Sequence, residues 1–561
     1  MQGLRAIHAK RFHLLRLLCA AAFAAILLAS TSARAATITV NSAADTTAND
    51  GVCTLREAIT AANTDTASGA AAGECAAGAL GLDTIVFAIP AATDPGCVVG
   101  TGVCTIAPAF ALPNIIDAVT IDGYTQTGAV ANTNTVASQL GLNGALKIQL
   151  TGTAGGNGLT IRAPAVTVRG LVVNGFTNGI DARLSAGGTI TLEGNYVGTN
   201  VTGTAVAGNG SVGINTGGTG SIVIGGTTPA ARNLISGNGR SLLGPGILTF
   251  TDIAATIQGN LIGTDVTGLV ALANGGPGIN ANPVTQAITV GGTAAGAGNL
   301  VTGNGYNNVS IFGGTGHFVQ GNLVGTNVTG TAALPSDMPF IPGNPRTGVH
   351  LVNTSNTLVG GTTVAARNII SGNVSGGVDI STVTGSAGGS NQVQGNYIGT
   401  DITGTVNLGN SGFGVLLSNS PGSSVGGSVA GAPNIIAFTV GGVGIGTALG
   451  VNNSLLGNSI HSNGGIGIDL GGNFFDGVTP NSPGGSQNYP VLTAAPIAAG
   501  TVNISGTLNG TASSTFRIEF FSSAVGDPTG YGEGQTFLGF ANVTTDGTGN
   551  VSFGPLPFAV P

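Results

Sequence analysis

Short apolar runs alternate with stretches rich in Gly, Asn and Thr over most of this 561-residue chain. Runs such as 221–224, 256–258 and 287–290 have the length of β-strands, and they lack the 3.6-residue periodicity of an amphipathic helix. Asn and Gly recur between the runs because a tight corner between short strands needs a positive φ angle, which these residues adopt at the lowest cost. The pattern predicts an all-β architecture.

A longer pattern recurs four times between residues 194 and 434. Its first half starts with a Gly-Asn pair and begins at Gly194, Gly259, Gly321 and Gly395. Its second half centres on Asn233, Asn299, Asn368 and Asn434. From the first unit to the fourth, each marker moves by 201 residues, which gives an average period of 67 residues. Such a period predicts a solenoid, in which each unit buries its apolar face against its neighbours.

The solenoid is predicted to be a parallel β-helix. The spacing of strand-sized runs and turns indicates three coils of about 22 residues per unit, whereas a propeller blade takes roughly 40 to 45 residues. Because parallel strands stack about 4.8 Å apart, we expect about sixteen coils in a rod of roughly 75 Å. The recurring Asn side chains are expected to bond the backbone of their turns and to stack on their counterparts in the next coil.

One position of the repeat alternates between an amide and an acid. It is occupied by Asn200, Asp265, Asn327 and Asp401. A turn tolerates this exchange, whereas a catalytic carboxylate does not. Asp265 and Asp401 also lie two units apart, which corresponds to six of the predicted coils or about 29 Å. We therefore expect these residues to shape turns.

The third unit carries eight extra residues, which align with Pro335–Pro342. Insertions in a solenoid bulge out as loops on one face. This loop contains Met338, Phe340 and Ile341, so it is a candidate exposed contact site for a partner. A loop that folds back on its own coil is the alternative.

The first 35 residues have the features of a secretory signal peptide. Basic residues precede an apolar run over 17–29, and Ala33-Arg34-Ala35 is a small-residue cleavage site. The run is too short to span a membrane, and no other stretch is long and apolar enough. The chain is therefore expected to be secreted or displayed on the outer cell surface. The expected domains are the signal peptide (1–35), an N-terminal cap region (36–135), the β-helix (136–492) and a β-sandwich-like module (493–561).

The net charge of the chain indicates which classes of partner it can bind. Cleavage of the leader would remove five of the 15 basic residues and none of the 22 acidic ones, which leaves a net charge of −12. A chain this acidic lacks the basic surface that binds nucleic acid. It also lacks a basic cluster for polyanionic pectin or alginate. The candidate partners are glycans or another cell-surface component, and the oligomeric state stays open.

The segment Cys53–Thr64 is the clearest predicted helix. Thr54 and Glu57 have the spacing of a capping box. The apolar residues Leu55, Ala58, Ile59 and Ala62 form one stripe. An amphipathic helix directly before a solenoid is expected to cover its open end, which otherwise exposes apolar side chains and strand edges.

Four cysteines remain after cleavage of the leader, an even number that favours disulfides in an exported protein. Four cysteines allow three connectivities. Cys53 and Cys75 flank the predicted helix, and Cys97 and Cys104 flank a short loop, so we expect these two pairs.

The string CTLREA at residues 53–58 resembles the CSLREA motif near the N-terminus of a group of exported bacterial proteins, with Thr54 in place of Ser. The segment 121–129, IDGYTQTGA, and the repeats with Gly-Gly-Thr and Ala-Arg-Asn are also similar to segments of this group. The resemblance implies a right-handed parallel β-helix, related in shape to pectate lyases, and a secreted or cell-surface location. It implies no particular reaction.

A catalytic site is not visible in the sequence. A glycoside hydrolase needs two carboxylates roughly 5 to 9.5 Å apart, and no pair of acidic residues in the repeats has a spacing that predicts this. The string 464–470, GGIGIDL, is a single copy of a calcium-binding pattern that works through consecutive copies, so neither a metal nor a cofactor is expected. We expect a structural, adhesin-like or glycan-contacting protein, with a polysaccharide lyase or hydrolase as the alternative.

After Tyr489 the pattern changes to alternating strands. Four such runs are predicted at 502–508, 516–521, 535–543 and 550–553. Arg517 and Glu519 share one strand face and are expected to be solvent-facing partners. A complete immunoglobulin-like sandwich needs about seven strands. We therefore expect the chain to stop inside this module.

Overall fold

The computed structural model describes residues 35–152, 155–383, 386, 388–446, 452–471, 477–482, 488–528 and 530–560. Almost all of the expected signal peptide, residues 1–34, lies outside the described residues.

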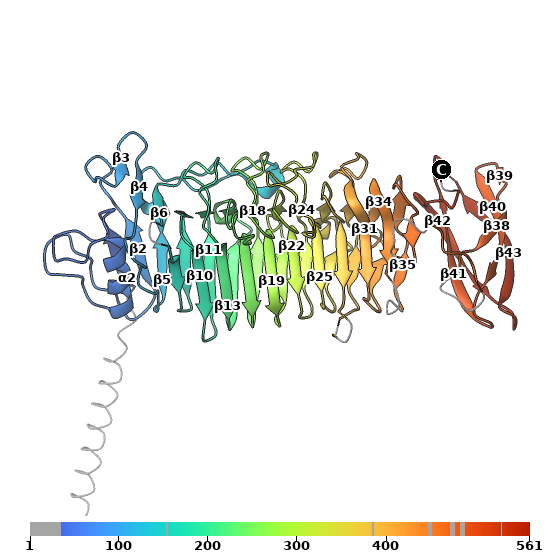
Figure 1. Cartoon of the computed structure of the whole chain (residues 1–561), viewed down its shortest axis with the longest axis horizontal. Helices are drawn as coiled ribbons and strands as arrows, with labels where there is room; N and C mark the ends of the chain where they lie inside the picture. The colour runs from blue at the N-terminus through green and yellow to red at the C-terminus, as the bar shows by residue number, and fades with distance from the viewer. Residues whose placement is uncertain are drawn as a thin grey trace, which may run out of the picture.

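Three long sheets run the length of a rod and define a parallel β-helix (Figure 1). Sheets A and B have 13 strands each and sheet C has 11. From residue 119 onward each coil passes through sheet A, then B, then C, and nearly all neighbouring strands are parallel. The fold class predicted from the sequence is confirmed.

Sheet A consists of β1 (Thr37–Val40), β2 (Asp83–Phe87), β5 (Val119–Asp122), β8 (Val166–Arg169), β11 (Thr189–Glu193), β14 (Gly220–Gly225), β17 (Ile253–Gln258), β20 (Ile288–Gly291), β23 (Phe318–Gln320), β26 (Leu358–Gly360), β29 (Gln392–Gln394), β32 (Ser424–Gly426) and β35 (Ser454–Leu456). Sheet B consists of β3 (Cys97–Val98), β4 (Val103–Ile106), β6 (Ile148–Thr151), β9 (Leu171–Asn174), β12 (Tyr196–Val197), β15 (Leu234–Ile235), β18 (Leu261–Ile262), β21 (Leu300–Val301), β24 (Leu323–Val324), β27 (Ile369–Ile370), β30 (Tyr397–Ile398), β33 (Ile435–Ala437) and β36 (Ser459–His461). Sheet C consists of β7 (Asn157–Ile161), β10 (Asn178–Leu184), β13 (Val212–Gly218), β16 (Ile247–Thr251), β19 (Ile279–Val284), β22 (Val309–Phe312), β25 (Val349–Val352), β28 (Val378–Ser381), β31 (Asn410–Ser418), β34 (Thr439–Ile445) and β37 (Ile468–Asp469).

The predicted number of coils per unit is wrong. In sheet A, Ile190 pairs with Ile222 and Ile222 with Ala255, so a coil takes 32 or 33 residues here (190 to 222 and 222 to 255). A unit of 67 residues therefore holds two coils and not three. The described rod accordingly has 13 strands in its longest sheets, where about sixteen coils were expected.

Loops on alternate coils explain why the sequence repeats every second coil. The loop after β12 accepts a hydrogen bond at the Gly203 carbonyl from the Val266 amide (2.8 Å), and Gly268 accepts one from Val328 (3.0 Å). Each loop thus bonds its counterpart two coils away. Their apolar side chains, with Tyr196 and Leu234, form a second core on the outer face of sheet B.

The interior of the rod is a single column of apolar side chains. In-register strands place Ile, Val or Leu above one another, so that Ile224, Ile257 and Val290 form one stack and are all fully buried. Burial of each such side chain contributes about 1.5–3 kcal/mol. This column is the main source of stability between coils.

Buried asparagines form a ladder at the corner between sheets A and B. The backbone N–H of each member donates to the side-chain oxygen of the next at 2.8–3.3 Å. Both markers of the repeat lie on this one ladder, in successive coils. Its members are Asn195, Asn233, Asn260, Asn299, Asn322, Asn368, Asn396, Asn434 and Asn458. The predicted stacking of asparagines between coils is confirmed.

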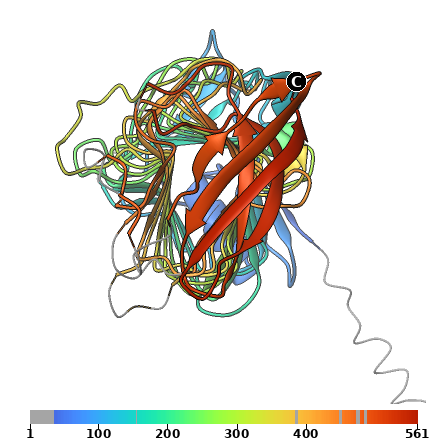
Figure 2. The ribbon, with the colours of Figure 1, turned by 90° about the vertical axis from the view of Figure 1, so that its right-hand side faces the viewer.

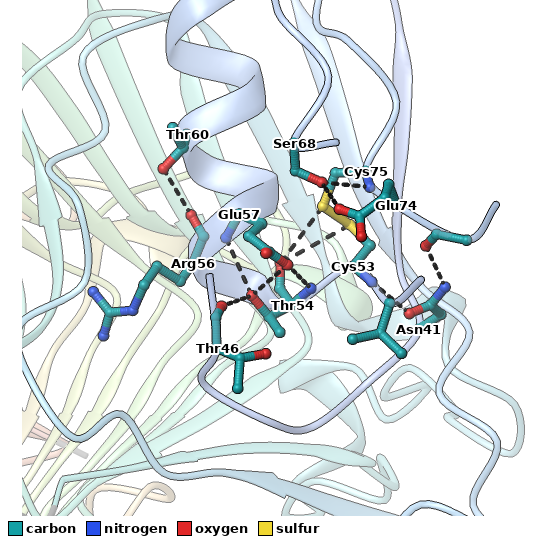
Figure 3. The surroundings of a disulfide bond; sticks show 12 residues. Asn41, Thr46, Cys53, Thr54, Arg56, Glu57, Thr60, Ser68, Glu74 and Cys75 are labelled. Carbon is teal, nitrogen blue, oxygen red and sulfur yellow. Dashed lines mark hydrogen bonds between the residues drawn. A yellow bond between two sulfur atoms is a disulfide. The ribbon is translucent and has the colours of Figure 1, made fainter. Parts of the chain in front are cut away.

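The N-terminal end of the rod is covered by α2 (Leu55–Thr64), the single α-helix of the described residues. The Thr54 hydroxyl accepts from the Glu57 amide and the Glu57 carboxylate accepts from the Thr54 amide, so the predicted capping box is present (Figure 3). Leu55, Ala58 and Ile59 are buried in the main core. The described part of the chain also contains four short 3₁₀ turns: η1 (Gly123–Thr125), η2 (Val136–Ser138), η3 (Pro229–Ala231) and η4 (Val364–Ala366).

Two disulfides fix this end. Cys53 is bonded to Cys75 (Figure 3), and Cys97 to Cys104, which are the pairs expected from the sequence. The first closes a 22-residue separation, and such a loop closure contributes about 3 kcal/mol. The strands β1, β2 and β5 already belong to sheet A, so the stack begins before the expected boundary at residue 136.

The C-terminal module lies across the other end of the rod (Figure 2). All four predicted runs are strands, and two short strands precede them. Phe520 packs against Phe553 and Phe558 and joins the two small sheets. One sheet contains β38 (Val491–Ala494), β39 (Ile497–Ala498), β40 (Thr501–Asn509) and β43 (Asn550–Ala559), and the other contains β41 (Thr515–Ser522) and β42 (Thr536–Thr544).

The expectation that Arg517 and Glu519 are both solvent-facing is wrong. They do form an ion pair at 2.9 Å, but the Glu519 side chain is only 10% exposed. Its other oxygen accepts a hydrogen bond from the Gly457 amide at 2.7 Å, in the last coil of the rod. The pair faces the solenoid because its strand lies against the end of the last coil.

Candidate functional site

A groove on the side of the rod is the candidate binding site. It has a volume of about 470 Å³ and crosses several coils near the C-terminal half. Its residues come from the loop after β24, from the turns that precede strands of sheet C and from the first residues of β31 and β34. They are Ala333, Pro335, Gly372, Asn373, Val374, Leu408, Gly409, Asn410, Ser411, Phe438, Thr439, Val440 and Gly464.

The lining of this groove combines apolar surface with uncharged polar groups. None of its lining residues is an acid or a base. Val374 and Val440 are 39% and 43% exposed on its walls. The side chains of Asn373 and Asn410 are bonded to each other at 2.9 Å and hold the floor in place. The groove therefore suits an uncharged ligand that has both apolar faces and hydroxyl groups.

Phe438 is the aromatic residue of the groove, and its backbone is strained. Its φ angle is +58°, a conformation that is a genuine outlier for a bulky residue. The ring contacts His461 edge-on, with centroids 6.0 Å apart, and burial lowers the pKa of His461. Strain of this kind costs on the order of 1–3 kcal/mol and clusters at ligand-binding positions.

The inserted loop at 335–342 borders the groove through Pro335. Asp337 ties it to earlier coils, because its carboxylate pairs with Arg240 at 2.9 Å and accepts from the Ala273 amide. The loop thus folds back on the rod, yet Phe340 and Ile341 remain 52% and 40% exposed. Met338 is half-buried. A contact role for Met338, Phe340 and Ile341 remains a prediction.

Two polar clusters lie on the outer face of sheet C. In the first, the buried Asp181 carboxylate contacts Arg162, and it also accepts from Arg183 at 2.9 Å and Asn215 at 2.8 Å. Both oxygens of this carboxylate thus accept from donors. The cluster is a structural ion pair network across adjacent coils.

The second cluster pairs His350 with Asp379 on adjacent strands of sheet C. The Asn307 amide lies 3.1 Å from His350 Nδ1, and Phe312 packs against the ring edge-on. Burial lowers the pKa of His350 and raises that of Asp379, while the opposite charge of each partner acts in the other direction. Asp181 is six strands away along the sheet, or about 29 Å. This cluster therefore has one carboxylate where retaining or inverting hydrolysis needs two.

The alternating Asn and Asp positions act in turns, as predicted. Asp401 accepts hydrogen bonds from the Thr405 and Val406 amides, and Asn327 does the same for Thr331 and Ala332. With two coils per unit, Asp265 and Asp401 are four coils apart, or about 19 Å, and not 29 Å. At this distance the two carboxylates cannot act together on one glycosidic bond.

His317 is a fully buried base inside the turn before β23. Its Nδ1 accepts from the Ile288 amide at 3.1 Å, and Nε2 lies 2.9 Å from the Gly313 carbonyl. Only the neutral ring with a proton on Nε2 satisfies both contacts. Burial accordingly lowers the pKa of His317 below its ordinary 6.5.

We predict that the protein loses stability as the pH falls below about 6.5. The unfolded chain takes up a proton at His317 there while the folded chain does not, so acid favours unfolding by up to about 1.4 kcal/mol per pH unit. His350 and His461 contribute with the same sign because burial lowers their pKa values too. Urea unfolding at neutral and mildly acidic pH measures how the free energy of unfolding depends on pH, and this dependence should be weaker for His317→Gln than for the wild type. An equally strong pH dependence in the variant would contradict the role given to His317.

Among the residues that the structure describes, no three His, Cys, Asp or Glu side chains gather closely enough to hold a metal ion. Across the same residues, no helix combines the length and apolar character needed to cross a membrane.

No protein-family model matches the chain, and no curated protein matches it significantly. Among solved structures, it is similar to the Dettilon tailspike protein, with 12% sequence identity over 85% of this chain and 86% of that chain, at a TM-score of 0.23. A likeness at this level carries no argument about function.

Proposed function

We propose that this chain is an exported β-helix that acts as a rigid surface rod and contacts an uncharged glycan through the groove beside Phe438. Export is supported by the leader-like N-terminus, by the CTLREA resemblance and by two disulfides, which persist in oxidising compartments. The observation that carries the binding role is a groove without charged lining, in which an aromatic residue has a strained backbone.

Sugar rings offer C–H faces that pack on aromatic side chains, and their hydroxyl groups bond to amides and hydroxyls. Phe438 with Val374 and Val440 supplies the first kind of surface, and Ser411 with neighbouring backbone groups supplies the second. The mature net charge of −12 expected after cleavage disfavours acidic polysaccharides. A neutral glycan therefore fits both the groove and the charge of the rod.

The test is binding to a panel of neutral and acidic polysaccharides by affinity gel electrophoresis and calorimetry. Phe438→Asn removes the ring while Asn tolerates a positive φ, and it should weaken binding to the retained neutral glycan by about tenfold or more. Phe318→Ala is the matched control, because Phe318 is an exposed ring on sheet A outside the groove. Equal loss in both variants, or retention of acidic polymers alone, would refute the proposal.

A further inference from the structure

The C-terminal end of the solenoid has the features of a self-association surface. The three sheets end at β35, β36 and β37, and the last strand of a sheet presents unpaired N–H and C=O groups that can pair with another strand. The asparagine ladder also ends here, at Asn458. A second column of polar side chains ends nearby at Asn463, which bonds Thr439 in the coil before it.

Two carboxylates of the C-terminal module cover these ends. Glu533 accepts from the Asn463 side-chain amide at 2.6 Å and from its backbone N–H at 3.1 Å. Glu519, held by Arg517, accepts from the Gly457 amide next to Asn458. Each glutamate thus takes the place that the acceptor of a further coil would occupy.

Backbone contacts complete the junction. The Ile460 amide donates to the Gly534 carbonyl at 2.9 Å, and the Ser459 hydroxyl donates to the Gln535 carbonyl at 2.6 Å. The segment 533–535 thereby imitates a short edge strand, in antiparallel pairing with β36. Among the described residues, the apolar core of the module is separate from that of the rod, and the printed contacts across the junction are polar.

We propose that the C-terminal module is a cap that keeps the last coil from pairing with the same end of a second copy of this chain. The partner is a second copy because an end coil is complementary in hydrogen bonding to another end coil. The other end of the rod is unavailable, since α2 covers it and the Cys53–Cys75 disulfide holds the cap region together. Like ends must therefore meet about a twofold axis, which closes the assembly at a dimer.

The experiment compares the full chain with the double variant Glu519→Lys/Glu533→Lys by analytical ultracentrifugation over a wide concentration range. Lysine places donors where the last coil needs acceptors, so the module should leave the end. The wild type should sediment as a monomer and the variant at twice the monomer mass. Glu193→Lys, on sheet A of the solenoid away from this end, is the matched control and should stay monomeric.

Circular dichroism and limited proteolysis separate the outcomes. A dimer with the solenoid spectrum intact supports the proposal, whether the module is folded or not, because either state uncovers the last coil. A monomeric variant whose module is cleaved by protease would overturn the self-association surface. A monomeric variant whose module stays protected would overturn the role of the two carboxylates. Masses that rise beyond a dimer would overturn the twofold closure.

Discussion

Replacing Asn299 with Ala should lower the free energy of unfolding by roughly 3–6 kcal/mol. The Asn299 side chain donates to the Ile257 carbonyl at 2.8 Å and to Asn322 at 3.0 Å. It also accepts from the Asn260 backbone and side chain, both at 3.0 Å. All of these groups are shielded from water in the middle of the ladder, so truncation leaves several donors and acceptors without partners, each at a cost of about 1–3 kcal/mol.

The matched control for this variant is Asn327→Asp. Asn327 caps an exposed turn with its side-chain oxygen, and Asp401 makes the same bonds in another unit, so Asp should change stability by less than about 0.5 kcal/mol. Urea unfolding followed by circular dichroism measures both variants. If Asn299→Ala costs no more than Asn327→Asp, the ladder does not hold the coils together as described.

Replacing Leu55 with Asp should destabilise the N-terminal end by about 4 kcal/mol or more and promote association. Leu55 is 1% exposed and packs in the main core beneath α2. The change removes a buried side chain and introduces a carboxylate with no partner there. An acidic residue is otherwise favourable in the first turn of a helix, so the loss reports burial and not helix propensity.

Thr60→Asp provides the comparison, because Thr60 is an exposed residue of the same helix. Its unfolding midpoint should stay close to that of the wild type. Light scattering should show larger particles for Leu55→Asp alone. Equal stability of the two variants would mean that α2 does not seal the first coil.

Much of the fold could be predicted because its determinants are local. Thr54 and Glu57 specify the helix start through bonds between residues three apart, and the recurring Asn specifies a corner wherever it occurs. The number of coils could not be counted correctly, because loop residues such as Val266 and Val328 are apolar like strand residues. They pack on the outside of sheet B and not inside the rod, and sequence periodicity does not separate these two faces.

The groove could not be predicted from the sequence, because its lining residues are far apart along the chain. Its walls bring together positions as distant as Ala333 and Gly464, and their proximity depends on which coils carry long loops. One weak sequence feature pointed to the groove: Phe438 is an aromatic residue at a corner where Asn or Gly is usual. Likewise, Glu519 and Glu533 are ordinary surface residues in the sequence, and their role follows only from where the module docks on the last coil.

One measurement tests most directly the proposed binding of a neutral glycan by the groove. The folded protein is incubated to equilibrium with the neutral polysaccharide that it retains best, and both bound protein and newly formed reducing or unsaturated ends are followed over time. We predict saturable binding and no ends above those of a sample without protein, because the Asp181 and Asp379 clusters are far apart and the groove has no acid or base. Steady release of new ends that scales with protein concentration would contradict the account and establish a carbohydrate-active enzyme.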